Sequence, residues 1–244
     1  MRNPDRQTTF HFKRFSVSNC RSAMKVGTDG VLLGAWAFED VEPGPMRMLD
    51  VGCGTGVISL MLAQRFPDAI IVGVDIDKDA VDEAASNFAS SPWSGRLTAV
   101  QCDFLRFNDA DGFDLIACNP PFFTDGALAP DAARRKARHQ DGLTFAALMR
   151  GASRLLRPGG RVAVVAPAEA ESELIAEACI CSLKPSRLTA VRTVERKKPR
   201  RILLECVKED KAVACSKSTL LISEPDGTPG QEYSRLVSPF YLKF

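Results

Sequence analysis

Short apolar runs alternate with longer amphipathic stretches through the middle of this 244-residue chain. The apolar runs have the length of buried strands and lie at 46–51, 70–74, 97–102, 113–118 and 161–166. The stretches between them have helical periodicity and cover 57–66, 78–90, 143–157 and 169–183. Repeated strand–helix–strand units of this kind predict a parallel sheet with helices on both faces.

Two further apolar runs, 188–194 and 202–207, are separated by a short basic turn that leaves no room for a crossover helix. We therefore expect these runs to form an antiparallel hairpin at the edge of the sheet. The predicted fold class is α/β, with a doubly wound, mostly parallel seven-stranded sheet that ends in this antiparallel edge hairpin.

The chain has the length of one domain, so we expect a single unit with short additions at both ends. An N-terminal segment (1–45) precedes the strand–helix core (46–207). A C-terminal extension (208–244) contains one short apolar run, 219–223, which we interpret as a strand.

Composition adds few constraints. The formal net charge is only +2, so any surface that binds nucleic acid must be local. No apolar run approaches the ~20 residues needed to span a bilayer, and the polar start lacks the apolar segment of a signal peptide. We therefore expect a cytoplasmic protein without a membrane segment, and no feature of the sequence indicates an obligate protein partner.

The eight cysteines do not form a recognisable framework. Four lie in or beside apolar runs, where we expect them to be small buried side chains: Cys53, Cys102, Cys118 and Cys206. No Cys-x-x-Cys pair is present, and the chain has only two histidines to assist in binding a metal. We therefore expect reduced thiols and no metal site.

The glycine-rich segment Asp50-Val-Gly-Cys-Gly-Thr-Gly56 joins the first core strand to the first core helix. Glycines at alternate positions allow a tight turn and a close approach of the backbone to a ligand. A dinucleotide-binding fingerprint, Gly-x-Gly-x-x-Gly, would need glycine at position 57, where this chain has Val57. The spacing instead resembles motif I of S-adenosylmethionine-dependent methyltransferases, and the alternative is a glycine-rich turn without a ligand. The predicted cofactor contacts from this segment are Asp50, Gly52, Cys53, Gly54 and Gly56.

Acidic residues end the next two strands. Asp75 lies 23 residues beyond Gly52, where its carboxylate can accept hydrogen bonds from both hydroxyls of a ribose, with Ile76 beside it. NAD-binding folds share this feature, so it does not separate the two cofactors. Asp103 resembles the methyltransferase position that accepts from the adenine amino group, with Phe104 beside the ring; the alternative is a surface turn. Four further carboxylates fit the solvated start of a helix: Asp77, Asp79, Asp82 and Glu83.

The fourth core strand ends in Asn119-Pro120-Pro121-Phe122, which matches the amino-methyltransferase motif Asn/Asp-Pro-Pro-aromatic. An exocyclic amine delocalises its lone pair into the base and is a poor nucleophile. The Asn119 side-chain oxygen and the Pro120 carbonyl can hold its two N–H groups and direct the lone pair toward a sulfonium methyl. Pro121 helps to fix the backbone, and Phe122 can stack on the base for about 1–3 kcal/mol. Asn119 is also a predicted cofactor contact, and a proline-rich turn is the alternative for the tetrapeptide.

The tetrapeptide indicates a nitrogen as the reacting atom and leaves the substrate open. Adenine N6 in nucleic acids, guanine N2 of ribosomal RNA and the glutamine amide of release factors all fit. A nicotinamide oxidoreductase is a further alternative, against which Val57 and the tetrapeptide argue. A non-catalytic module that binds S-adenosylmethionine or RNA is another, which the intact Asn119 disfavours.

Blocks at both ends of the chain narrow this choice. Residues 12–17, 23–37 and 240–242 resemble the bacterial tRNA1(Val) adenine-37 N6-methyltransferase family. The resemblance implies a Rossmann-like class I methyltransferase that uses S-adenosyl-L-methionine and releases S-adenosylhomocysteine. Its substrate would be the adenosine beside the anticodon of tRNA1(Val), in the anticodon stem-loop. The resemblance also implies that one segment closes over the methionine end of the cofactor, through Lys25, Gly27, Thr28 and Asp29. A capped helix start is the alternative for this segment.

Two basic runs are candidates for contacts with tRNA phosphates. One follows the tetrapeptide and the other surrounds the turn of the predicted hairpin; the residues are Arg134, Arg135, Lys136, Arg138, Lys197, Lys198, Arg200 and Arg201. Either run could instead be a solvated face. If the runs bind tRNA, its affinity should fall steeply with salt concentration.

Overall fold

The computed structural model describes residues 9–22, 25–120 and 143–243. Its main sheet has eight strands in the order β10-β8-β9-β7-β6-β3-β4-β5, and β9 runs antiparallel to both of its neighbours while all other pairs are parallel. The strands are β3 (Arg47–Val51), β4 (Ile70–Asp75), β5 (Leu97–Gln101), β6 (Phe113–Cys118), β7 (Leu156–Pro167), β8 (Leu183–Arg192), β9 (Arg201–Lys208) and β10 (Ser216–Leu221). The five expected core strands are present. Strand β7 starts earlier than expected because Leu156 already pairs with Phe113 of β6, before an irregularity in the register at residues 157–160.

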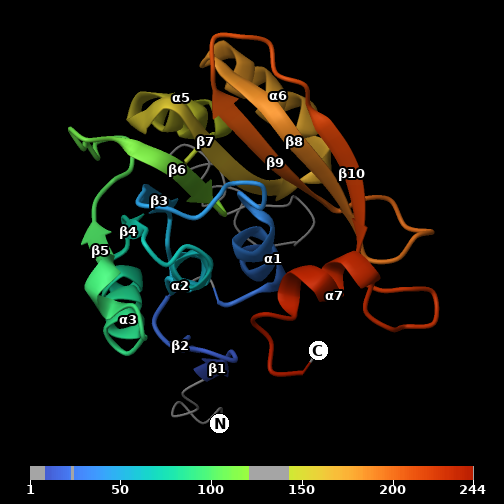
Figure 1. Ribbon diagram of the computed structural model, residues 1–244, viewed down its shortest axis with the longest axis horizontal. Coiled ribbons are helices and arrows are strands. Elements are labelled where there is room, and N and C mark those ends of the chain that lie inside the picture. The colour runs from blue at the N-terminus through green and yellow to red at the C-terminus, as the bar shows by residue number, and fades with distance from the viewer. Residues whose placement is uncertain (1–8, 23–24, 121–142, 244) are drawn as a thin grey trace, which may run out of the picture.

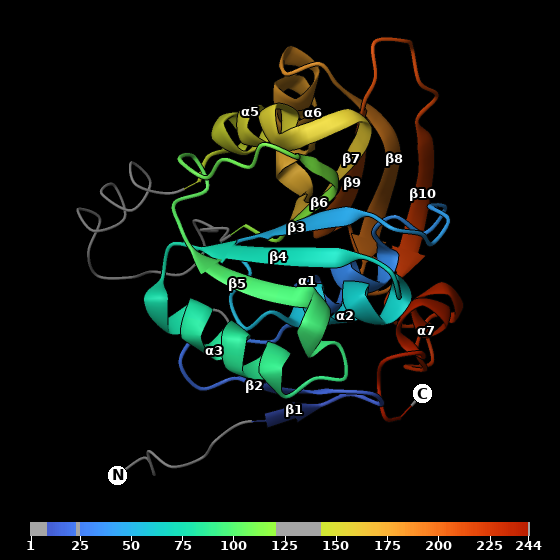
Figure 2. The same cartoon turned by 60° about the vertical axis from the view of Figure 1, so that its left-hand side comes forward.

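Helices cover both faces of the sheet, as Figure 2 shows. One face carries α1 (Thr28–Trp36), α2 (Val57–Arg65), α3 (Lys78–Ala89) and α7 (Gln231–Val237). The other carries α5 (Phe145–Leu155) and α6 (Glu171–Ile180). Each face buries its own apolar cluster, which confirms the doubly wound arrangement. Within the described residues, no helix is long and apolar enough to cross a membrane.

Within the described residues the sheet has eight strands rather than the seven expected, and the β8–β9 hairpin is not at its edge. The C-terminal extension adds β10 parallel to β8 and thereby covers the hairpin. Leu220 is buried in β10, whereas the first four residues of this strand are exposed. Main-chain pairing with β8 therefore holds β10 in the sheet, since few of its side chains are buried.

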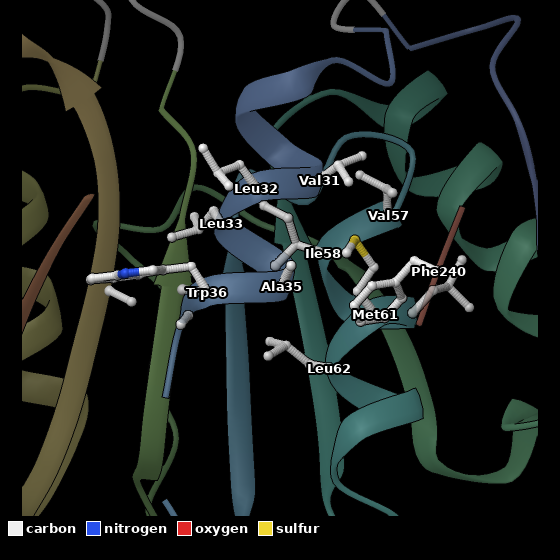
Figure 3. Packing of buried hydrophobic residues seen from close by; sticks show 14 of the residues in the cluster. Val31, Leu32, Leu33, Ala35, Trp36, Val57, Ile58, Met61, Leu62 and Phe240 are labelled. Carbon is white, nitrogen blue, oxygen red and sulfur yellow. The ribbon is translucent and has the colours of Figure 1, made fainter. Parts of the chain in front are cut away.

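Helix α1 is almost wholly buried, with seven of its nine residues in the core. Gly34 lets it approach α2 closely, because a Cβ at this position would lie 2.9 Å from Sδ of Met61. Figure 3 shows Met61 and Phe240 together beside α1. At the other side of α1, the Trp36 indole Nε1 donates to the Thr189 hydroxyl of β8 at 3.0 Å. These contacts fix the C-terminal end of α1 relative to α2 and the sheet.

The two ends of the described chain meet beside α7 (Figure 1). Strands β1 (Thr9–His11) and β2 (Ser16–Ser18) form a separate antiparallel hairpin. Phe12 bridges to Tyr241, with their rings stacked at a centroid distance of 5.9 Å. The Lys13 main-chain N–H donates to the Phe240 carbonyl at 2.7 Å.

Candidate functional site

The carboxyl ends of β3, β4, β5 and β6 meet at one edge of the sheet, because these strands are parallel neighbours. In folds of this kind, that edge is where ligands bind. A pocket of about 410 Å³ opens there. It is lined by Lys25, Gly27, Thr28, Asp29, Gly30, Gly52, Cys53, Gly54, Thr55, Val57, Ile58, Asn119, Pro120 and Arg201.

The pocket unites segments that are distant in sequence. The predicted cofactor residues that line it are Lys25, Gly27, Thr28, Asp29, Gly52, Cys53, Gly54 and Asn119. The predicted cofactor residues outside its lining are Asp50, Gly56, Asp75, Ile76, Asp103 and Phe104. Six predicted residues lie outside the described part of the chain: Pro121, Phe122, Arg134, Arg135, Lys136 and Arg138.

The glycine-rich segment turns sharply between β3 and α2. Gly52 and Gly56 have φ of +67° and +78°, in the left-handed region that favours glycine. A Cβ at Gly56 would lie 2.4 Å from the ring of Phe88, so this glycine allows α3 to pack against the turn. A Cβ at Gly52 would meet nothing within 4 Å, which leaves its backbone open to the pocket.

Asp50 is fully buried beneath this turn. Its Oδ2 accepts from the Ser59 main-chain N–H at 3.0 Å and from the Ser59 hydroxyl at 2.7 Å. Its Oδ1 is buried without a hydrogen-bond partner among the described residues. Burial raises the pKa of this carboxyl to about 6, although the bonds from Ser59 oppose the shift.

The next two strand ends differ in what they offer to a ligand. Asp75 accepts from the Gly54 main-chain N–H at 2.9 Å, so its carboxylate lies against the glycine turn. The neighbouring Ile76 is 70% exposed, which is unusual for a large apolar side chain. Asp103 accepts from the Leu105 main-chain N–H at 2.9 Å. Phe104 is only 6% exposed, so little of its ring is available for contact with a ligand.

Glu83 has a role that the sequence interpretation missed. It was assigned to the solvated start of a helix, but it is 3% exposed. Its carboxylate accepts main-chain N–H bonds from Cys20, Arg21 and Ser22, the last two at 2.9 Å. Burial tends to raise the pKa of Glu83, but these bonds outweigh it and hold the pKa below its ordinary value. A carboxylate of α3 therefore anchors the segment that leads to the pocket.

Asn87, one turn further along α3, completes this anchor. Its Oδ1 accepts from the Ser18 main-chain N–H at 2.8 Å, and its Nδ2 donates to the Ser18 and Thr55 carbonyls at 3.0 and 2.9 Å. The N-terminal segment and the glycine-rich turn are thus joined through one side chain. Nothing local in the sequence indicated this contact, since its partners lie 69 and 32 residues away.

Asn119 follows β6 directly and is half-buried, and Pro120 is buried. The Asn119 Nδ2 lies 3.7 Å from the position that a Cβ on Gly30 would occupy, so α1 begins close to this amide. The Asn119 amide oxygen and the Pro120 carbonyl are acceptors of the type needed to hold an amine.

The basic residues of the turn between β8 and β9 lie in two different environments. Arg196, Lys197, Lys198 and Arg200 are exposed. Arg201 instead lines the pocket, and its Nε donates to the Asp29 carboxylate at 2.7 Å.

The eight cysteines are free thiols. Cys53, Cys118 and Cys206 are buried as predicted, and Cys102 is half-buried. Burial raises the pKa of the Cys53 and Cys118 thiols well above the ordinary value. The Cys53 thiol, which lines the pocket, is therefore a neutral side chain there. No group of three or more potential metal ligands was found in the described residues.

The chain is similar in sequence to known proteins over nearly its full length. The family described as "Methyltransferase domain" matches residues 44–220. The tRNA1(Val) (adenine(37)-N6)-methyltransferase of Porphyromonas gingivalis is 45% identical over 240 residues, which cover 95% of this chain and 94% of the relative. Proteins of the same name from Bacteroides thetaiotaomicron and Aeromonas hydrophila are each 41% identical, over 96% and 98% of this chain and 97% and 99% of theirs.

Solved structures share the fold. A predicted O-methyltransferase from Agrobacterium tumefaciens aligns with a TM-score of 0.69 and 18% identity over 87% of this chain and 96% of that chain. The 16S rRNA N2 methyltransferase of T. thermophilus, in complex with AdoMet and guanosine, aligns with a TM-score of 0.56 and 23% identity over 82% of this chain and 50% of that chain.

Proposed function

Because the chain belongs to the tRNA1(Val) (adenine(37)-N6)-methyltransferase family, and is thus a tRNA adenine methyltransferase, we propose that its pocket is the site of methyl transfer. In this proposal the pocket holds S-adenosyl-L-methionine and presents its methyl group to N6 of adenosine 37, beside Asn119. The observation that supports it most directly is the shared lining. The glycine-rich turn and the Asn119-Pro120 pair face one cavity, where a donor and an acceptor can meet.

Three features of the site fit this cofactor. The open backbone at Gly52 allows a ligand to lie close to the turn. The buried Asp50 Oδ1 has no partner among the described residues, which suits a site completed by a ligand or a water molecule. The exposed Ile76, next to Asp75, offers an apolar surface to an adenine ring beside a carboxylate for the ribose hydroxyls. S-Adenosylmethionine supplies an electrophilic methyl group on a positively charged sulfur.

The residues of the chain act mainly by holding the amine. The Asn119 side-chain oxygen and the Pro120 carbonyl accept hydrogen bonds from the two N–H groups of the target amine. This directs the nitrogen lone pair toward the pocket. The amine becomes strongly acidic once it is methylated and can release its proton to water, so no strong base is needed. Positioning can contribute several kcal/mol to such a reaction, roughly 7–11 kcal/mol in favourable cases. Stacking of the base on Phe122 stays a prediction, since this residue lies outside the described part of the chain.

One experiment tests both the substrate and the site. Radiolabelled S-adenosylmethionine is incubated with total tRNA, ribosomal RNA and a release factor, and the labelled position is mapped by mass spectrometry. We expect label on adenosine 37 of tRNA1(Val). Label on a guanine of ribosomal RNA or on a glutamine of the release factor would refute adenosine 37 as the substrate. Asn119→Ala should lower turnover roughly hundredfold or more while cofactor binding by calorimetry persists; unchanged turnover would refute the assignment of Asn119.

The basic turn between β8 and β9 supports a proposed contact with the anticodon stem-loop. Arg201 at the start of β9 lines the pocket, and the exposed Lys197 and Lys198 precede it by only four and three residues in the same turn. We expect Lys197→Glu with Lys198→Glu to weaken tRNA binding and to reduce its salt dependence by about one unit of slope per lost phosphate contact. Lys211→Glu is a matched control, because this exposed lysine follows the opposite end of β9. Equal effects at both ends would remove the turn from the interface.

A further inference from the structure

Arg201 was expected among the tRNA contacts, yet the fold directs it to the pocket. Strand β9 is reversed, so its first residue pairs with Pro167 at the carboxyl end of β7 and reaches the ligand-binding edge. The Arg201 Nε donates to Asp29 Oδ2 at 2.7 Å, and its Nη1 donates to the Arg200 carbonyl at 3.0 Å. Asp29 and Arg201 both line the pocket. An acidic and a basic group thus lie side by side in its wall.

The other cation in the pocket lining, Lys25, is tied to the main chain by two of its three N–H groups. The Lys25 ammonium donates to the Asn19 and Cys20 carbonyls at 2.9 and 3.0 Å, which closes the segment before α1. The Arg201 Nη2, by contrast, has no acceptor within the described part of the chain. Because Nε and Nη1 are held, the plane of the Arg201 guanidinium is fixed before a ligand arrives, which favours binding of a carboxylate.

We propose that Arg201 and Asp29 form the site for the amino-acid end of the cofactor, with Arg201 binding its α-carboxylate and Asp29 binding its α-ammonium. This inference rests on the proposed use of S-adenosylmethionine. A zwitterion carries both charges on neighbouring atoms and matches the pair, whereas a tRNA phosphate would meet the Asp29 carboxylate beside Arg201. Arg201 therefore selects for the amino-acid end of the ligand and does not contact RNA.

The test compares two ligands by calorimetry. S-Adenosylhomocysteine carries the amino-acid end, and 5′-methylthioadenosine has the same nucleoside and a thioether sulfur but lacks that end. Arg201→Gln should weaken the binding of S-adenosylhomocysteine roughly tenfold or more, because it removes a charged hydrogen bond. The binding of 5′-methylthioadenosine should stay within about twofold. Arg200→Gln, which changes the adjacent exposed arginine, is the matched control and should alter neither affinity.

Two results would overturn the proposal. If Arg201→Gln weakens the binding of both ligands equally, Arg201 supports the fold. If both ligand affinities are unchanged and tRNA binding is weaker, Arg201 is an RNA contact. Arg201→Lys keeps the charge and should recover part of the affinity for S-adenosylhomocysteine. If melting curves show that the glutamine variant is unfolded, Arg201→Lys is tested instead. A loss of affinity for S-adenosylhomocysteine alone supports the proposal, and an equal loss for 5′-methylthioadenosine refutes it. A wild-type protein that binds neither ligand would refute the proposed cofactor, whatever Arg201 does.

Discussion

Replacing Asp50 by asparagine should raise the stability of the protein without cofactor, relative to wild type, as the pH rises through about 6. The carboxyl is fully buried, one of its oxygens has no partner in the described residues, and burial raises its pKa from 3.8 to about 6. A pKa raised by about 2 units corresponds to about 3 kcal/mol of stability that is lost once the group is ionised. Asparagine is neutral at every pH and keeps an oxygen for the two bonds from Ser59. The variant therefore avoids this loss, although its Nδ2 lies where Oδ1 has no partner and costs about 1–3 kcal/mol at every pH.

The direction of the pH dependence follows from the raised pKa of Asp50. Its protonated form contributes stability that is fully present below the unfolded pKa of 3.8 and is lost as pH rises through about 6. The free energy of unfolding of Asp50→Asn should therefore increase relative to that of wild type as the pH rises. Roughly half of the 3 kcal/mol difference should appear between about pH 5 and about pH 8.

Urea unfolding across this pH range, without cofactor, measures the difference. Asp68→Asn changes an exposed aspartate just before β4 and serves as the control, for which we expect a constant difference from wild type. If the Asp50→Asn difference is also independent of pH, Asp50 does not carry the electrostatic strain assigned to it. The same variant should bind S-adenosylmethionine more weakly, which would explain why a destabilising carboxylate occupies this position.

Three further substitutions test the packing around the pocket. Gly56→Ala should lower the free energy of unfolding by about 2 to 5 kcal/mol in urea titrations, because its φ is +78° and a Cβ would strike Phe88; wild-type stability would contradict this contact. Gly34→Ala should cost about 1 kcal/mol in the same assay, since the clash with Met61 outweighs the gain in helix propensity, and a stabilised variant would show that α1 and α2 can separate freely. Glu83→Gln should cost about 1 to 3 kcal/mol and raise the KM for S-adenosylmethionine more than it lowers kcat, because an amide accepts fewer main-chain bonds; an unchanged KM would separate this anchor from the pocket.

Local signals in the sequence were sufficient for the parallel core and for much of the pocket. Gly52 and Asn119 could be assigned because a tight turn and a rigid strand end each need particular residues at fixed spacing. The role of Glu83 could not, because its burial depends on N–H groups more than 60 residues away in sequence. The same holds for Arg201, which the sequence predicted as a tRNA contact, because its partner Asp29 lies 172 residues away. The sequence predicted a strand at 219–223 but not its place beside β8, because this pairing involves main-chain groups that any polar sequence offers.

The contact between Phe12 and Tyr241 has a consequence for how the protein is made. Ribosomes add about 5 to 20 residues per second, so roughly 10 to 50 seconds separate the synthesis of these two residues. During that time the first aromatic segment has no C-terminal partner, and Asp29 lacks its partner Arg201 until β9 has been synthesised. The wall of the pocket therefore waits for β9, because Arg201 is synthesised 172 residues after its partner Asp29. A truncated product that ends before β9 would contain the glycine-rich turn and Asn119 but could not complete the site.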